Sequence, residues 1–158
     1  MKKILTIAIA TTLAASAAYA ASKPSPRIPA ADLKWEQPMG PNSLSLAFVV
    51  GDAKSKGRTE FFLKFPGGFE SGWHTHDGDY DATVVKGTMT AQAQGDAAET
   101  ALPPGSFFGE PAKKNHRNSC TKDGECIIFV RAEKGFSFHP MTPEGKPVPA
   151  PKADAAKK

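Results

Sequence analysis

The sequence predicts an all-β fold, an antiparallel sandwich or barrel. The chain carries many short runs of β-branched and aromatic residues, and turns rich in Gly, Pro and Asp separate these runs. After the first 20 residues, no segment keeps the 3.6-residue hydrophobic period of an amphipathic helix. A chain of 158 residues is about the length of one domain. These three observations together indicate a single β domain.

The first 20 residues have the pattern of a bacterial secretory signal peptide. Two lysines precede an apolar run over residues 4–18, and the small-x-small signature at residues 18–20 predicts cleavage after Ala20. The run is too short, and too rich in Ala and Thr, to favour a retained transmembrane helix. A retained amphipathic anchor is the alternative. We therefore expect a periplasmic or secreted protein with no membrane attachment after cleavage.

The positive charge of the chain is concentrated near its two ends. The formal net charge is +4, but two lysines lie in the predicted signal peptide and four more lie in residues 146–158. Aromatic residues do not alternate with Arg and Lys as they do on many nucleic-acid-binding faces. We therefore expect no nucleic-acid partner.

The segment after the signal peptide leads into the predicted barrel. Residues 21–41 are rich in Pro and Ala, and we expect an extended N-terminal lead-in that docks Trp35 on the barrel. The barrel itself is predicted over residues 42–140. Its first strands are expected at residues 43–50, which alternate and then run apolar, and at residues 59–65, which are dense in aromatic side chains.

The rest of the predicted barrel consists mostly of shorter strands. They are expected at residues 82–85, 84–94 with a break at Gly87, 99–102, 106–108, 126–132 and 136–138. Four bulky aromatic residues are expected to fill the core, namely Phe62, Trp73, Phe107 and Phe129. Residues 141–158 contain almost no bulky apolar side chain, so a disordered tail is expected there.

Two cysteines, Cys120 and Cys126, are separated by a short polar segment. Export would place them in an oxidising compartment, which favours a disulfide. A three-residue hairpin loop at residues 122–124, with Gly124 in the left-handed position, would place the cysteines opposite each other. The alternative is a pair of metal-binding thiolates.

The chemistry of the chain is concentrated in residues 72–87. His74 and His76 are two positions apart, and side chains two apart on a strand point to the same face. Two imidazoles on one face can bind one metal ion as neutral nitrogen donors. The alternative is a pair of polar residues on an exposed strand.

This spacing resembles the first motif of the cupin superfamily, which has a His-x-His pair, then a Glu, and a Gly at its end. The Gly of this motif is Gly87, and Tyr80 stands where the family has its Glu. Asp81 is the alternative metal ligand or proton-transfer group, but its parity is opposite to that of the histidines unless the strand bulges. We therefore expect a site built mainly from histidine, with Tyr80 beside it.

The second cupin motif has a Pro-x-Gly turn, then a His and often an Asn. Pro111 and His116 keep the Pro-to-His spacing, but Lys113 replaces the Gly and Cys120 the Asn. His116 is thus the third expected imidazole. The resemblance covers roughly residues 43–138 and is closest to small single-domain bacterial cupins similar to the cupin part of ChrR-type anti-sigma factors. It implies a cupin-type antiparallel β-barrel (a double-stranded β-helix or jelly roll) and a homodimer.

Three imidazoles leave coordination positions open, as catalytic metal sites do. They suit Fe, Mn, Ni, Cu and Zn, so the identity of the divalent transition metal stays open. The first hypothesis is a metal-dependent oxygenase or dioxygenase for a small anionic or enol-like substrate, in which Tyr80, Asp81 or Glu110 handles protons. The second is a non-catalytic protein that binds a metal or small ligand as a sensor or carrier. The third is a partner-binding cupin with an empty site.

Overall fold

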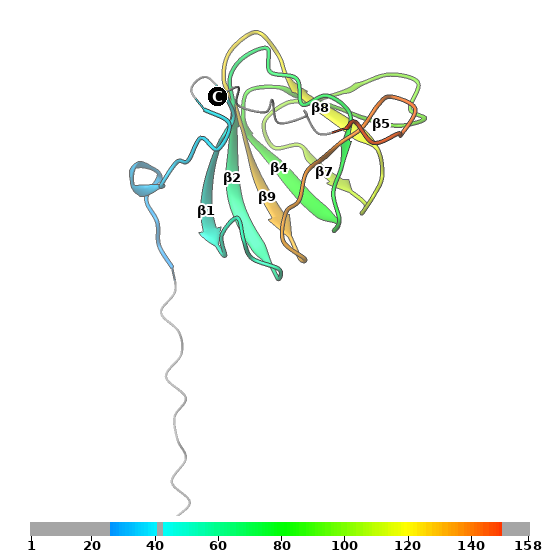
Figure 1. Ribbon diagram of the computed structural model, residues 1–158. Coiled ribbons are helices and arrows are strands. Elements are labelled where there is room, and N and C mark those ends of the chain that lie inside the picture. The colour runs from blue at the N-terminus through cyan, green and yellow to red at the C-terminus, as the bar shows by residue number, and fades with distance from the viewer. Residues whose placement is uncertain (1–25, 41–42, 150–158) are drawn as a thin grey trace, which may run out of the picture.

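The computed structural model describes residues 26–40 and 43–149, and within them the fold is two antiparallel β-sheets of five strands each. The first sheet has the order β1 (Ser45–Val50), β2 (Thr59–Phe65), β9 (Cys126–Ala132), β4 (Tyr80–Lys86) and β7 (Phe107–Glu110). The second has the order β10 (His139–Pro140), β3 (His74–Thr75), β8 (His116–Cys120), β5 (Met89–Ala93) and β6 (Thr100–Leu102). In Figure 1 the strands of the first sheet stand side by side, and β8 and β5 lie apart from them.

This architecture confirms the predicted all-β jelly-roll class. All strand pairs in the two sheets are antiparallel. The predicted strands at 59–65 and 126–132 match β2 and β9 in both bounds. The predicted strand at 136–138 is wrong, because the last described strand is β10, one residue further on. Among the described residues, no helix is long and apolar enough to cross a membrane.

The core lies between the two sheets and follows the two-residue period of the strands. Phe61, Leu63 and Phe65 of β2 point inward, and so do Ile128 and Val130 of β9. Alternate residues of a strand face opposite sides of its sheet, so β2 and β9 each contribute every second side chain to this core.

None of the four aromatic residues predicted to fill the core belongs to it. Phe62 and Phe129 face each other across β2 and β9 on the outer side of the sheet, with ring centroids 5.1 Å apart. Phe107 is 65% exposed. The periodicity of the sequence was correct, but it did not say which of the two phases faces the core. Trp73, the fourth, is half-buried beneath the Arg117 guanidinium.

The lead-in extends the edge of the first sheet. It contains one short 3-10 turn, η1 (Ala30–Asp32), and then Glu36 exchanges two backbone hydrogen bonds with Leu46 of β1, at 2.8 and 2.9 Å. The Lys64 ammonium lies 4.0 Å from the centre of the Trp35 ring. The lead-in thereby covers the β1 edge, which otherwise offers unpaired backbone groups to other chains.

Residues 141–149 differ from the expected disordered tail. The Met141 amide donates to the Trp73 carbonyl at 2.9 Å, and the Asn115 side chain donates to the Thr142 carbonyl at 3.1 Å. The segment is held by backbone groups rather than by bulky side chains, so hydropathy alone could not reveal it. The predicted signal peptide and residues 150–158 lie outside the described residues.

The predicted disulfide between Cys120 and Cys126 is present, but the predicted hairpin is wrong. Cys120 ends β8 in one sheet and Cys126 begins β9 in the other. Cys120 pairs with Met89 and Cys126 with Phe65, so the bridge joins the two sheets at a crossover. A disulfide is consistent with an oxidising compartment.

Removing this bridge should destabilise the fold measurably. We expect the double variant Cys120→Ala/Cys126→Ala to lose about 2 kcal/mol of unfolding free energy, the chain-entropy value for so short a loop. Urea unfolding of the oxidised wild type and the variant measures the difference. Equal midpoints would show that the crossover is held by packing alone.

Gly87 ends β4 at a position that other residues cannot occupy. Its φ is +72°, and an added Cβ would lie 2.6 Å from the Glu125 carbonyl oxygen and 2.9 Å from the Cys126 sulfur. The turn that follows β4 must therefore pass directly over the start of β9. This contact accounts for a glycine at the end of the motif that carries the histidines.

Candidate metal centre

Three imidazoles meet at the inner surface of the second sheet. His74 lies in β3, His76 follows it, and His116 begins β8 directly opposite His74. Each residue is at most 3% exposed. One ring nitrogen from each lies within 4.8 Å of the other two, which is close enough for a shared ion. The structure thus brings together the three histidines that the sequence singled out.

The other nitrogen of each ring is held by the backbone. Nδ1 of each imidazole lies against a carbonyl oxygen, in the pairs His74–Gly72 (3.0 Å), His116–Lys114 (2.8 Å) and His76–Ser137. A carbonyl only accepts, so Nδ1 carries the proton in each neutral ring. The Nε2 lone pairs are then free to point at a common ion, the arrangement typical of metal-binding histidines.

Burial keeps these imidazoles neutral. It lowers the pKa of His74 to about 4 and, together with the neighbouring His74, the pKa of His76 to about 3. Burial also lowers the pKa of His116. Metal ions bind only the neutral ring, so all three are ready donors at neutral pH.

One atom of the cluster is fully buried and has no partner among the described residues. His76 Nε2 is buried and makes no hydrogen bond among the described residues. A buried polar atom without a partner costs free energy, and such atoms are rare in folded proteins. A divalent transition metal held by the three Nε2 atoms would satisfy it. Three nitrogen donors without a described carboxylate fit Fe, Mn, Ni, Cu or Zn without selecting among them.

Tyr80 lies beside the imidazoles, as its parity predicts. It points inward from β4, is 5% exposed, and places its hydroxyl 3.4 Å from His116 Nε2 and 3.4 Å from Asn118 Oδ1. Burial, with a contribution from Glu110, holds the pKa of this phenol well above its usual value. The hydroxyl therefore keeps its proton at neutral pH and can donate one hydrogen bond into the site.

Asp81 does not reach the imidazoles. β4 pairs with β9 without a bulge from Tyr80 to Val84, so Asp81 faces away from the core and is exposed. It lies beside Gly109 of β7 instead. The strand parity that argued against Asp81 in the sequence also holds in the structure.

Two further polar residues belong to the site. Asn118 lies two residues after His116 on β8 and so shares its face, a spacing that could have revealed it. Glu110 pairs with Tyr80 across β4 and β7, and its carboxylate lies 3.7 Å from His116 Nδ1. Burial, with a smaller contribution from Asp96, raises the pKa of Glu110 to about 7. Only the β4–β7 register reveals this contact.

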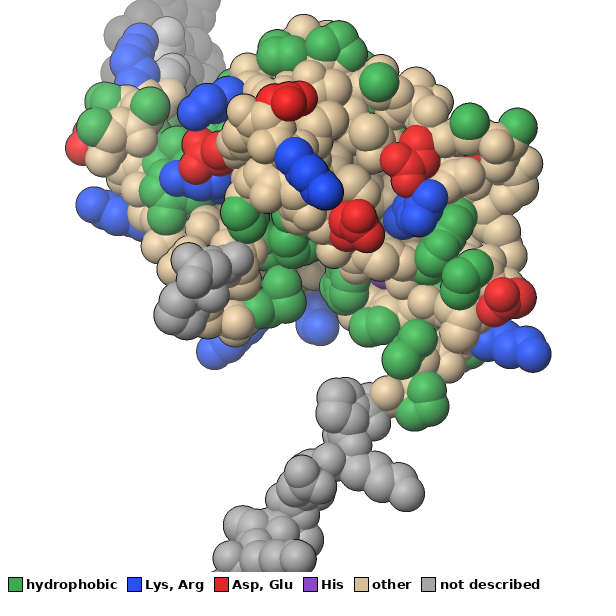
Figure 2. Space-filling model, turned by 90° about the horizontal axis from the view of Figure 1, so that it is seen from above, with side chains coloured by type: hydrophobic (Ala, Val, Ile, Leu, Met, Phe, Trp, Pro, Cys, Tyr) green, Lys and Arg blue, Asp and Glu red, His purple; other side chains and the backbone are tan. Residues whose placement is uncertain are grey.

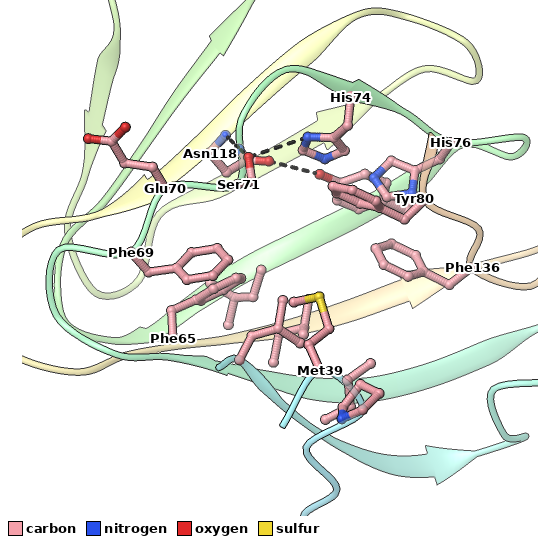
Figure 3. A pocket seen from close by; sticks show the side chains of 16 residues that line it. Met39, Phe65, Phe69, Glu70, Ser71, His74, His76, Tyr80, Asn118 and Phe136 are labelled. Atoms are coloured by element: carbon pink, nitrogen blue, oxygen red, sulfur yellow. Dashed lines mark hydrogen bonds between the residues drawn. The ribbon is translucent and has the colours of Figure 1, made fainter. Parts of the chain in front are cut away.

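A cavity of about 440 Å³ opens from the imidazole cluster between the two sheets. Figure 3 shows His74, His76 and Tyr80 together along one side of it, and Phe65, Phe69 and Met39 across from them. Its size is in the range of small-molecule sites. The imidazole cluster therefore lies at the wall of a chamber that can hold an organic ligand.

With two antiparallel sheets around a buried three-histidine cluster, this protein has a cupin-type fold. It belongs to the family described as Domain of unknown function (DUF4437), whose profile matches residues 22–139. Among curated proteins, no match to this chain was found. The closer likeness to the ChrR-type cupin domain stays a prediction.

Solved structures support the same class. The chain is similar to KdgF from Halomonas sp., with 18% identity and a TM-score of 0.57 over 70% of this chain and 96% of that one. An RmlC-like cupin from Shewanella frigidimarina is 18% identical, with a TM-score of 0.57 over 70% of this chain and 93% of that one. The polyketide cyclase RemF from Streptomyces resistomycificus is 14% identical, with a TM-score of 0.63 over 81% of this chain and 88% of that one. At these identities the likeness concerns the fold alone.

Proposed function

We propose that this chain is an exported cupin that binds one divalent transition metal through His74, His76 and His116. We further propose that it acts as a metal-dependent oxygenase. The observation that carries the proposal is the convergence of three neutral imidazoles, each fixed through Nδ1 by a backbone carbonyl. Such preorientation is typical of metal centres and has no role in a core histidine that only fills space. The disulfide is consistent with the exported location.

The residues around the cluster suit chemistry more than structural metal binding. Three protein ligands leave positions open for substrate and a second reactant, whereas structural zinc sites are closed by four. When bound, the metal would supply Lewis-acid and, if iron, redox chemistry. Tyr80 would donate a hydrogen bond to the bound substrate, and Glu110, whose carboxylate lies 3.7 Å from His116 Nδ1, would handle protons beside the cluster.

Nitric oxide binding tests whether the bound metal has open coordination positions, and the test needs no known substrate. The Fe(II)-loaded protein under anaerobic conditions should bind nitric oxide, a stand-in for O₂, and give the electron paramagnetic resonance signal of a high-spin iron nitrosyl. Tyr80→Phe should keep the iron content and change the shape of this signal, because the phenol lies 3.4 Å from His116 Nε2. Asp81→Asn, on the outer face of β4, is the control and should change neither.

A second candidate is a non-catalytic metal- or ligand-binding sensor. One observation favours it, namely that Tyr80 occupies the position of the family's Glu and brings no charged ligand. Iron that binds tightly but does not take up nitric oxide would support the sensor and contradict the oxygenase.

A further inference from the structure

The walls of the cavity are almost entirely apolar away from the imidazoles. Leucine, isoleucine and phenylalanine side chains from β1, β2 and β9 and from the connecting segments form them, including Leu46, Leu63, Ile128, Phe65, Phe69 and Phe136. The polar groups are confined to one side, where His74, His76, Tyr80, Ser71 and Asn118 lie (Figure 3). The cavity therefore presents one polar pole and a long apolar body.

The side chains that line the cavity offer no positive charge to an anionic ligand. No lysine or arginine is among the described residues that line it, and the one charged residue there is the exposed carboxylate Glu70. A carboxylate or phosphate would lose its hydration against leucine and phenylalanine with no cationic side chain to replace it. A sugar would lose the partners of most of its hydroxyl groups for the same reason.

The apolar lining continues to the surface. Met39 and Phe138 both line the cavity, and they are 63% and 49% exposed. In Figure 2 hydrophobic side chains are scattered over the face shown, charged side chains lie among them, and only a trace of histidine is visible. An apolar entrance to a buried polar pole suits a ligand that enters with its oxygen first.

We propose that the cavity binds a neutral, ring-sized apolar molecule whose one hydroxyl or carbonyl oxygen points to the imidazole cluster. Among the anionic or enol-like substrates expected from the sequence, the walls favour those whose body away from the imidazoles is neutral and apolar. The role of the oxygen rests on the proposed function, because the metal would be its partner. The selection for a neutral apolar body depends on the walls alone.

Two fluorescent probes with the same rings test this selection. N-phenyl-1-naphthylamine is neutral, and 8-anilino-1-naphthalenesulfonate adds a sulfonate to the same skeleton. We expect the metal-free protein to bind the neutral probe at least about tenfold more tightly, because the sulfonate must be desolvated in an apolar cavity. Equal affinities, or tighter binding of the sulfonate, would overturn the proposal.

Matched variants locate the binding site. Leu46→Trp fills the cavity from β1, and Val50→Trp makes a similar change on the same strand outside the cavity, where Val50 is 37% exposed. We expect Leu46→Trp to weaken the neutral probe about tenfold and Val50→Trp to change it less than about twofold. A second pair, Ile128→Phe inside the cavity and Ile127→Phe on the opposite face of β9, repeats the comparison if Leu46→Trp does not fold.

The outcomes separate this inference from the proposed function. Loss of neutral-probe binding in a folded cavity variant, with its matched control unchanged, supports the inference whether or not metal binds. Neutral-probe binding that neither cavity variant alters would overturn it. A protein that prefers the neutral probe but takes up no metal contradicts the proposed function alone, and one that takes up metal but binds no neutral probe contradicts the inference alone.

Discussion

Replacing His76 with alanine is expected to weaken metal binding by more than about 100-fold, because loss of even an outer-shell partner of a metal ligand costs about 10- to 100-fold. His76 is the natural first choice, since its Nε2 is buried without a partner. His116→Ala should have a similar effect, because its Nε2 comes from the opposite strand. Competition with a chromophoric zinc chelator measures both affinities.

The fourth histidine of the chain provides the control. His139 is half exposed and lies 3.0 Å from Asp77 in a surface pair. His139→Ala removes an imidazole near β3 without touching the cluster, so zinc affinity should stay within about threefold of wild type. An equal loss in His139→Ala and His76→Ala would show that the metal binds at the surface instead.

Metal affinity should depend only weakly on pH between about pH 7 and about pH 5.5, less than about tenfold. Three ordinary imidazoles would be mostly protonated at about pH 5.5 and would lose affinity several hundred-fold, because each proton competes with the ion. Burial lowers the pKa of His74 to about 4 and of His76 to about 3, so both rings are still neutral there. Protonation of these two rings should displace the ion only near these lower pH values.

Equilibrium dialysis against zinc at the two pH values measures this effect, and the protons released on zinc binding provide a second readout. Neutral rings have none to release, so fewer than about one proton per zinc should appear near pH 6. Release of two or more protons would show that the free site opens and hydrates its imidazoles.

Local periodicity explains what the sequence predicted correctly. The two-residue period placed His74 and His76 on one face, turned Tyr80 toward them and turned Asp81 away. It also gave the bounds of β2 and β9. These features depend only on neighbours in the chain, which a single sequence records in full.

The errors concern relations between distant segments. The hairpin between Cys120 and Cys126 failed because the two strands belong to different sheets, which local turn residues do not encode. Whether Phe62 and Phe129 face the core depends on which of the two alternating faces of β2 and β9 packs toward the second sheet. Glu110 lies near His116 because of the β4–β7 register. This register pairs two strands that are separated in the sequence, so local periodicity does not predict it.

The apolar cavity could not have been predicted in the same way. Its walls come from the lead-in, from strands of both sheets and from segments after β2 and β9, so no single stretch of sequence shows its polarity. The sequence suggested an anionic substrate because Tyr80 stands where the family has a Glu, so the site has one negative charge fewer. The described residues that line the cavity add no positive charge, and Glu70 adds a negative one.

The most direct test of the central claim is X-ray absorption spectroscopy of the zinc- or iron-loaded full-length protein, with elemental analysis of the same sample. The account predicts about one ion per chain, with about three imidazole nitrogens as its protein ligands. It also predicts that the imidazole scattering disappears together with the ion in His76→Ala. A protein that holds no ion after reconstitution with Fe, Mn, Ni, Cu and Zn, or an ion bound without imidazole, would contradict the account.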